Sequence, residues 1–244
     1  MAKQRADVLV VERGLASSRE RARALILAGQ VWSGSRRVDK AGDQLAHDAA
    51  LEVRGADIPY VSRGGVKLAG ALDAFALDPR DMIVADIGAS TGGFTDCVLQ
   101  RGAAKVYAID VGYGQLHDKL RRDDRVVVME RTNARHLRPS DLAEAVNLIV
   151  IDASFIGLDK LLPAVVPLLT ENGHVIAMVK PQFEVGRAQV GKGGVVRDEA
   201  ARQAAINRVI TDAAALGLSL RNQADAVIDG PHGNREHFLW LTRP

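Results

Sequence analysis

The sequence predicts an α/β protein in which a mostly parallel, doubly wound sheet of seven strands follows a small α+β head. From about residue 60 onward, near-continuous apolar runs alternate with helix-length segments, which is typical of a parallel sheet covered on both faces. The first forty residues instead read as two short helices followed by short strands. A length of 244 residues leaves room for one large domain or two unequal ones.

The body of the chain supplies the strands and helices of this sheet. The predicted strands are Met82–Ile87, Lys105–Asp110, Val126–Glu130, Asn147–Asp152, His174–Val179, Phe238–Thr242 and, from a weaker pattern, Ala224–Ile228. The predicted helices are Lys67–Ala76, Gly93–Gln100, Leu158–Leu168 and Asp198–Leu216. Alternation of this kind predicts that the carboxyl ends of the parallel strands lie at one edge, where ligands of such sheets bind.

The head is predicted to hold a helix over Ala6–Arg13 and a second one that starts at Ser17, where Glu20 completes a capping box. Short strands are predicted at Val31–Ser33, Arg37–Val38 and Leu51–Val53. We place the domains at residues 1–56 and 62–244, with residues 57–61 as the linker between them. Pro59 fixes the backbone of that linker.

Charge is distributed unevenly along the chain. Residues 1–40 hold nine Lys or Arg against four acids, a net charge of +5, which leaves −3 for the remaining residues. A basic head on a slightly acidic body indicates contact with a polyanion, although a solvated helix surface gives the same pattern.

Composition excludes several classes of protein. The single cysteine, Cys97, excludes a disulfide framework and a multi-cysteine zinc site, and it fits a reducing cytoplasm. The most apolar stretch, Leu161–Leu169, is too short to cross a membrane and contains two prolines. The N-terminus lacks the apolar region of a signal peptide. The six histidines have no metal-binding spacing, so we expect no metal, no membrane and a cytoplasmic protein.

A glycine-rich turn after the first body strand predicts a nucleotide-like ligand. It reads Asp86-Ile-Gly-Ala-Ser-Thr-Gly-Gly-Phe, and Asp110 ends the next strand, where a carboxylate can accept hydrogen bonds from ribose hydroxyls. NAD and S-adenosylmethionine both fit so far. Ser90 replaces the middle glycine of a pyrophosphate loop, and Asp86 repels phosphate but suits a cationic ligand, so S-adenosylmethionine is favoured.

The residues predicted to contact this cofactor lie at the turn and at the ends of the neighbouring strands. Phe94 opens the helix after the turn and is either a cofactor contact or an aromatic residue of the core. Asn133 is included because it follows the third strand. The full set is Asp86, Gly88, Ser90, Gly92, Gly93, Phe94, Asp110, Val111 and Asn133.

Four charged residues form a candidate catalytic set. Asp152 and Lys180 each end an apolar strand, Glu236 precedes the last strand, and Lys67 lies near the start of a helix. Isolated charges are costly at such positions, so opposite charges on adjacent strands favour a functional pair. Transfer of a methyl group to a ribose hydroxyl requires a base, and a lysine that has lost its proton can serve as one, with carboxylates orienting it.

Together these residues resemble the TlyA-type ribosomal RNA 2′-O-methyltransferases, which have long been labelled hemolysins. The head is similar to S4 RNA-binding domains through Arg5-Ala-Asp-Val-Leu-Val-Val-Glu-Arg-Gly-Leu and Ser18-Arg-Glu-Arg-Ala. The body resembles FtsJ-type methyltransferases through Tyr60-Val-Ser-Arg-Gly-Gly-Val-Lys-Leu, the turn at Asp86, Lys180-Pro-Gln-Phe-Glu and Gly233-Asn-Arg-Glu.

This resemblance implies a Rossmann-like class I methyltransferase sheet and S-adenosylmethionine-dependent methylation of a cytidine ribose in ribosomal RNA, with the large subunit favoured. The Lys-Asp-Lys-Glu tetrad of the family falls on Lys67, Asp152, Lys180 and Glu236. The arginines expected to contact RNA are Arg5, Arg19, Arg23, Arg36, Arg37 and Arg63.

Two other functions remain open at this point. The first is a membrane-active hemolysin, which rests on the historical label alone. The second is a non-catalytic RNA-binding factor in ribosome assembly. The sequence leaves the target nucleotide and the oligomeric state open.

Overall fold

The computed structural model describes residues 3–16, 18–27, 29–54, 58–186, 189–230 and 233–243. The chain divides into two compact units, Met1–Arg63 and Gly64–Pro244, which we call the head and the body. Each unit has its own hydrophobic core. Three residues at the predicted domain boundary, Gly55, Ala56 and Asp57, lie outside the described residues.

The head combines two short helices with two small antiparallel sheets. Its elements are β1 (Lys3–Arg5), α1 (Ala6–Glu12), α2 (Arg19–Leu27), β2 (Val31–Ser33), β3 (Arg36–Arg37), β4 (Gln44–Ala46) and β5 (Leu51–Val53). β1 pairs with β4, and the other sheet has the order β3-β2-β5. The apolar faces of α1 and α2 close the core of the head with Val10, Leu25 and Ile26.

The structure adds two strands to the prediction for the head and shifts a third. The strands β1 and β4 were not expected, because three-residue strands with polar, largely exposed residues carry no apolar pattern. The strand predicted at Arg37–Val38 lies one residue earlier, since Val38 turns into the core. At the start of α2 the hydroxyl of Ser18 accepts a hydrogen bond from Arg21 N–H at 3.2 Å; Ser17, the predicted cap, lies outside the described residues.

The body contains a seven-stranded, mostly parallel sheet, which confirms the predicted fold class. Its order is β11-β12-β10-β9-β6-β7-β8, and β12 alone runs antiparallel to its neighbours. The strands are β6 (Ile83–Ile87), β7 (Lys105–Ile109), β8 (Val126–Met129), β9 (Val146–Ile151), β10 (Leu169–Val179), β11 (Ser219–Asp225) and β12 (His237–Thr242).

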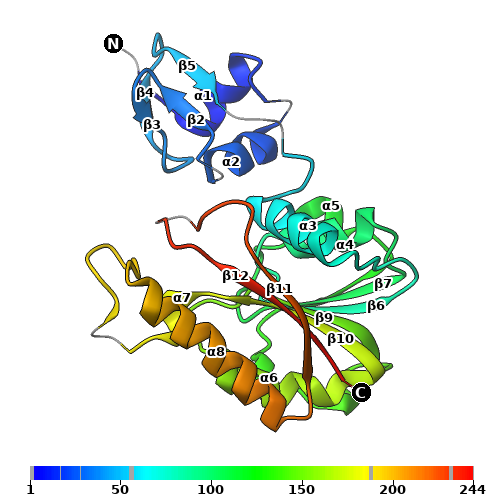
Figure 1. Ribbon diagram of the computed structural model, residues 1–244. Helices are drawn as coiled ribbons and strands as arrows, with labels where there is room; N and C mark the ends of the chain where they lie inside the picture. The colour runs from blue at the N-terminus through cyan, green and yellow to red at the C-terminus, as the bar shows by residue number, and fades with distance from the viewer. Residues whose placement is uncertain are drawn as a thin grey trace. The chain divides into compact units, whose positions relative to one another are not determined.

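Helices cover both faces of this sheet (Figure 1). One face carries α3 (Arg63–Phe75), α4 (Gly93–Gln100) and α5 (Asp118–Arg121), and the other carries α6 (Leu158–Val165) and α8 (Glu199–Ala215). The remaining helices are short: α7 (Pro181–Glu184) and the 3-10 turns η1 (Ala134–His136), η2 (Pro139–Asp141) and η3 (Val166–Leu168). No helix among the described residues combines the length and apolar character that a membrane crossing requires.

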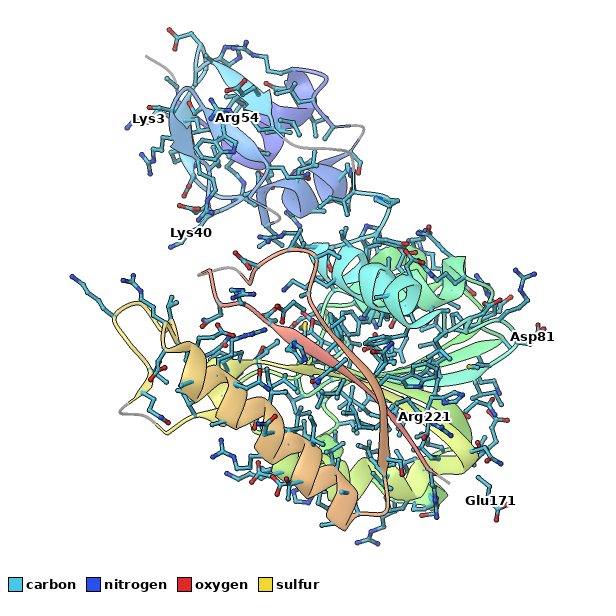
Figure 2. The ribbon with its side chains drawn as sticks, in the orientation of Figure 1. Lys3, Lys40, Arg54, Asp81, Glu171 and Arg221 are labelled. Carbon is cyan, nitrogen blue, oxygen red and sulfur yellow. The ribbon has the colours of Figure 1, made fainter. Side chains whose placement is uncertain are left out.

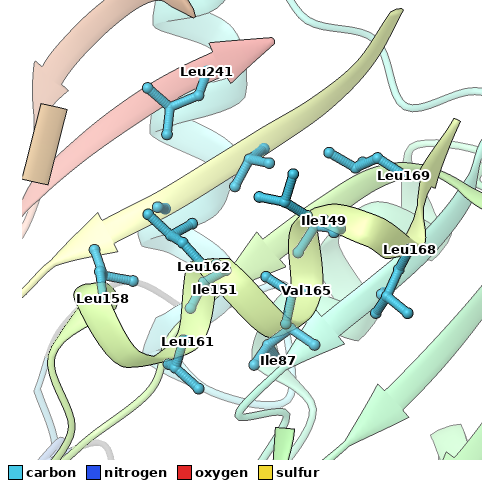
Figure 3. Packing of buried hydrophobic residues seen from close by; sticks show 14 of the residues in the cluster. Ile87, Ile149, Ile151, Leu158, Leu161, Leu162, Val165, Leu168, Leu169 and Leu241 are labelled. Atoms are coloured by element: carbon cyan, nitrogen blue, oxygen red, sulfur yellow. The ribbon is translucent and has the colours of Figure 1, made fainter. Parts of the chain in front are cut away.

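The helix α6 shows how the sheet is covered. Its apolar residues recur at helical spacing, and Leu158, Leu161, Leu162 and Val165 are buried in the cluster that contains the central strands (Figure 3). The opposite side of α6, including Lys160 and Pro163, is exposed. This helix therefore fixes the loop that precedes it, residues 152–157, at the carboxyl end of β9.

Two strand predictions for the body were wrong in extent. The predicted strand Ala224–Ile228 overlaps β11 by only two residues, because β11 is an exposed edge strand of mostly polar residues paired with β12 alone. The strand predicted at His174–Val179 begins earlier, at Leu169, and contains an irregularity before His174. Asn172 has a φ of 59° there, so the strand bends where the sequence lacks an apolar run.

A buried carboxylate ties three arginines of the head together. The side chain of Asp7 in α1 is fully buried, and it accepts hydrogen bonds from Arg5 Nε at 3.0 Å, Arg19 Nη2 at 3.1 Å and Arg23 Nε at 3.1 Å. Hydrogen bonds from Arg5, and then from Arg19 and Arg23, outweigh the effect of burial and hold the pKa of Asp7 far below its usual range. Each arginine remains about half exposed.

We predict that Asp7→Asn lowers the free energy of unfolding of the head by about 1–3 kcal/mol. A buried anion that accepts hydrogen bonds from three arginines is replaced by a neutral amide with one acceptor oxygen. A carboxyl with a lowered pKa contributes stability above its unfolded pKa of about 3.9, and this contribution disappears as the pH falls below that value. Hydrogen exchange of the α1 and α2 amides in the full chain measures both effects.

The control variant is Asp39→Asn, which removes the exposed partner of Arg37. Exposed pairs contribute little, so its exchange rates should stay close to those of the wild type. Equal effects of the two variants would show that the buried cluster does not stabilise the head.

Candidate active site

The turn after β6 requires glycine at two positions. Gly88 has a φ of 85°, and a Cβ there would lie 2.8 Å from the carbonyl oxygen of Asp152, so a larger residue would push β6 and β9 apart. Gly92 has a φ of 93° and packs against Leu116 and Leu120. The turn then enters α4 at Gly93, where the first amide groups of a helix lack intrahelical partners. Backbone donors are thus available at the carboxyl edge of the sheet.

Asp86, the last but one residue of β6, is completely buried below this turn. Its Oδ2 accepts hydrogen bonds from the backbone N–H and the hydroxyl of Thr95, at 2.9 and 2.6 Å. Its Oδ1 is buried and has no hydrogen-bond partner among the described residues. Burial raises the pKa of Asp86 to about 7 against the effect of the Thr95 hydrogen bonds, and the negative charges of Asp152 and Asp110 raise it further.

Asp110 holds the neighbouring loops in place. Its Oδ2 accepts a hydrogen bond from Ser90 N–H at 2.8 Å, and its Oδ1 accepts one from Gly112 N–H at 2.7 Å. Ser90 itself has a φ of 49°, and its hydroxyl donates to Gln115 Oε1 at 3.3 Å. The carboxylate predicted to bind ribose therefore also organises the turn on which it lies.

The other predicted cofactor residues occupy different environments. The Phe94 side chain is 2% exposed, and its ring centroid lies 6.1 Å from that of Phe238, so its ring belongs to the core. Val111 is 69% exposed. Asn133 Oδ1 accepts a hydrogen bond from Arg135 N–H at 3.1 Å and caps η1. Of these three side chains, Val111 alone is substantially exposed.

The four charged residues of the candidate catalytic set form two ion pairs. Lys180 Nζ lies 2.5 Å from Asp152 Oδ1 and donates a hydrogen bond to Ser154 Oγ at 2.9 Å. Lys67 of α3 forms an ion pair with Glu236, which is 169 positions away in the sequence. Lys67, Lys180 and Glu236 are all buried.

Strand register explains why these pairs share one edge of the sheet. Val179 lies opposite His237 in the antiparallel pair of β10 and β12, so Lys180 and Glu236 follow at neighbouring positions. β9 lies on the other side of β10, and Asp152 directly follows its last residue. The Asp152 backbone N–H also donates to Ile87 O at 3.0 Å, which joins this edge to the glycine turn.

The structure also shows residues near this edge that the sequence patterns did not reveal. Phe155 is 91% exposed with a φ of 65°, and its ring centroid lies 5.2 Å from that of Phe183. Asn234 is buried; it accepts a hydrogen bond from Val196 N–H and donates one to Gly194 O. The sequence offered one signal for Phe155, because this aromatic residue lies three positions after Asp152 at the end of a strand. Its exposure and its positive φ could not be predicted from sequence periodicity.

The structure brings three of the six predicted RNA-contacting arginines together, since Arg5, Arg19 and Arg23 surround Asp7. Arg36 and Arg37 form β3, and Arg37 Nε lies 2.7 Å from Asp39 Oδ1. Arg63 is the first residue of α3. Further cations of the head include Lys3, Lys40 and Arg54, which Figure 2 labels.

A metal centre has no basis in the part of the chain that the structure describes. Residues 3–16, 18–27, 29–54, 58–186, 189–230 and 233–243 contain no group of three His, Cys, Asp or Glu side chains that could hold an ion.

Comparison with known proteins agrees with both units. Residues 60–243 match the FtsJ-like methyltransferase family, and residues 4–50 match the S4 domain. The chain is 47% identical over 238 residues to 16S/23S rRNA (cytidine-2′-O)-methyltransferase TlyA of Mycobacterium tuberculosis, covering 97% of this chain and 89% of that one. It is 36% identical to 23S rRNA (cytidine-2′-O)-methyltransferase TlyA of Campylobacter jejuni, covering 75% and 71%.

A solved structure of a hemolysin-type protein from Streptococcus thermophilus is also similar, with a TM-score of 0.79 and 44% identity over 100% of this chain and 89% of that one. The match spans head and body. The chain therefore belongs to the FtsJ-like methyltransferase family, within its TlyA-type members that carry an S4 domain.

Proposed function

We propose that this protein transfers a methyl group from S-adenosylmethionine to the 2′-oxygen of a cytidine ribose in ribosomal RNA. The single observation that carries the proposal is the presence of two lysine–carboxylate ion pairs at the sheet edge that also bears the glycine turn. The names of the TlyA relatives state this reaction for those proteins. We assign RNA binding to residues 1–56, the linker to 57–61 and the chemistry to 62–244, in the cytoplasm where ribosomes are methylated.

We further propose that the large-subunit RNA is the substrate. The Mycobacterium tuberculosis relative is named for the RNAs of both subunits and the Campylobacter jejuni relative for 23S rRNA. The large-subunit RNA is common to both names. Methyl transfer to separated small and large subunits from a strain that lacks this enzyme tests the preference, and modification of the small subunit at an equal rate would contradict it.

The cofactor pocket we propose is built on the turn after β6. S-adenosylmethionine supplies an electrophilic methyl group on a cationic sulfonium. The buried Oδ1 of Asp86 has no partner among the described residues and suits a positively charged ligand group, reached directly or through water. Gly88 and Gly92 allow the tight backbone of this turn, and Asp110 offers remaining acceptor positions for ribose hydroxyls.

We propose Lys180 as the general base. In its neutral form Nζ would accept the proton of the ribose 2′-hydroxyl while the oxygen takes the methyl group. The bond between the methyl carbon and the sulfonium sulfur would break at the same time and leave a neutral thioether. Asp152 and Ser154, both in contact with Nζ, fix the direction of the amine. The Lys67–Glu236 pair is more buried than the Lys180–Asp152 pair, and its two opposite charges compensate each other. We therefore assign it to orienting the ribose hydroxyl.

We propose Phe155 as a surface on which the target base stacks. A phenyl ring that is 91% exposed in a left-handed conformation is unusual, and Phe183 supports it from one side. Ser154, the preceding residue, contacts Lys180. The phenyl ring is therefore one residue away, along the chain, from a contact of the proposed catalytic lysine. Stacking of a base on an aromatic side chain is a common mode of RNA recognition.

We predict that Lys180→Ala lowers the single-turnover rate of methyl transfer to ribosomal subunits by about 10²–10⁴-fold, the usual contribution of a general base. Binding of S-adenosylmethionine should stay close to that of the wild type. Lys105→Ala is the matched control, since Lys105 lies at the opposite edge of the sheet and pairs with Glu144. A Lys180→Ala variant as active as the control would remove Lys180 as base.

The raised pKa of Asp86 predicts a pH-dependent affinity for S-adenosylmethionine. Below pH about 7 the carboxyl is protonated in the free protein. A cationic ligand favours the ionised form, so affinity should rise as the pH increases through 7 and then level off, with release of a proton on binding. Calorimetry between pH 6 and 8.5, in buffers of different ionisation enthalpy, measures both quantities.

Asp86→Asn serves as the reference in that experiment, because it keeps the shape and cannot ionise. The pH dependence should be weaker in this variant than in the wild type. Identical pH profiles for the two proteins would show that the ionisation of Asp86 does not affect the affinity for S-adenosylmethionine.

Replacement of Phe155 by alanine is predicted to lower kcat/KM for ribosomal subunits by about 5–100-fold, the effect of losing one stacked base. Because the ring is exposed, the free energy of unfolding should change little. Phe155→Tyr preserves the ring and should keep the activity. If Phe155→Ala retains full kcat/KM, the ring does not contact the RNA.

A further inference from the structure

The outer surface of the body contains a cavity of about 400 Å³ whose lining is strongly basic. Arg135, His136, Arg138 and Lys160 line it, and Leu137, Pro163 and Ala164 complete its wall. We call this cavity the basic pocket. Its lining includes no carboxylate.

The backbone that carries these cations is held firmly. Asn133 caps η1 by accepting a hydrogen bond from Arg135 N–H at 3.1 Å, and Arg138 N–H donates to Asp141 Oδ2 at 2.8 Å. Leu137, between the two arginines, is anchored in the core with 7% of its surface exposed. Lys160 lies on the exposed side of α6, whose other side is buried against the sheet (Figure 3). The pocket is therefore a formed feature of the surface.

The cations of the basic pocket have no ionic partners in the part of the chain that the structure describes. Among the described residues, no carboxylate lies within ion-pair distance of Arg135, His136, Arg138 or Lys160, whereas exposed arginines elsewhere in the body, such as Arg121 and Arg125, are paired. Asp141 accepts a hydrogen bond from the backbone N–H of Arg138, and the negative charge of Asp159 helps to raise the pKa of the partly buried Glu184, where burial is the larger cause. Three like charges around one cavity repel each other, so an anion that enters it would be stabilised.

The basic pocket lies close along the chain to the edge that bears the candidate active site. η1 begins five residues after β8 ends. Lys160 is the third residue of α6, which follows the loop of Asp152, Ser154 and Phe155. An RNA strand that places a ribose beside Lys180 thus has its neighbouring nucleotides within reach of this side of the body. Arginine is well suited to phosphate, because its planar group donates two parallel hydrogen bonds.

We propose that the basic pocket binds a backbone phosphate of the RNA strand that flanks the target nucleotide. This inference rests on the proposed function, since it takes RNA to be the substrate. It assigns to the methyltransferase unit a phosphate contact outside the candidate active site, in addition to any made by the head. Contacts to phosphate position a strand without reading its sequence, so the pocket sets the register in which the ribose meets Lys180.

The test is the double variant Arg135→Ala/Lys160→Ala. We expect the KM for large ribosomal subunits to rise about tenfold, with kcat and the affinity for S-adenosylmethionine within about twofold of the wild type. Binding to the subunits, measured by filter retention between 50 and 200 mM salt, should show a logarithmic slope smaller by one to two, because each lost phosphate contact removes close to one unit.

Two further variants separate the pocket from net charge. Arg80→Ala/Arg122→Ala removes the same charge from exposed arginines at the other end of the body strands, and it should leave KM and the salt slope unchanged. Arg135→Lys/Lys160→Arg keeps the charge and should retain most of the affinity. The proposal is overturned if Arg135→Ala/Lys160→Ala behaves like the Arg80/Arg122 variant.

The design also separates this proposal from the proposed function. If the wild type transfers no methyl group to either subunit, the proposed function fails, and the salt-dependent binding measurement alone decides on the basic pocket. If the wild type is active and the pocket variant binds and reacts as the Arg80/Arg122 control does, the function stands and the pocket proposal falls.

Discussion

The structure depends on pairing four charged side chains at the edge of an otherwise apolar sheet. Lys67 and Glu236 are almost completely removed from water, and Lys180 is buried next to Asp152. Unpaired, any one of them would carry a large desolvation cost, and removal of a single partner leaves a buried charge behind. Apolar residues in these places would cost less, so the retention of two complete pairs is best explained by chemistry that needs an amine and a carboxylate together.

The carboxyl edge also concentrates negative charge. Asp86, Asp110 and Asp152 lie close enough to raise the pKa of Asp86, whose burial is the larger cause. Thr95 satisfies one oxygen of Asp86 and the other remains without a partner among the described residues. Such an arrangement costs stability in the free protein and is relieved by a cation. It thus suits a sulfonium ligand better than a pyrophosphate.

The periodicity of apolar residues was sufficient to predict the fold, and the positions of polar residues at strand ends indicated the candidate active-site residues. Asp152 and Lys180 stood out because each ends an apolar strand, and the glycines at 88 and 92 because a strand runs directly into a helix there. The sequence placed Lys67 and Glu236 in the same candidate set but did not pair them, since their contact depends on how α3 packs across the sheet. The polar edge strand β11 was misplaced because it buries almost nothing.

Other features depended on contacts that a linear pattern does not encode. The sequence marked the head arginines as expected RNA contacts but did not show that Arg5, Arg19 and Arg23 converge on Asp7, a carboxylate within an apolar helix. Phe94 has its ring in the core, the alternative that the sequence left open. Arg135 and Arg138 come from one segment and Lys160 from another, so the basic pocket exists only once η1 packs on α6.

The central claim is that the amine of Lys180 removes the proton from the ribose hydroxyl. Chemical rescue measures this most directly, with small primary amines added to Lys180→Ala in single-turnover methyl transfer to ribosomal subunits. The account predicts that methylamine or ethylamine restores part of the lost rate, and that the restored rate follows the concentration of the unprotonated amine as the pH increases. A rate that is indifferent to added amine at every pH, in a variant that still binds S-adenosylmethionine and RNA, would contradict it.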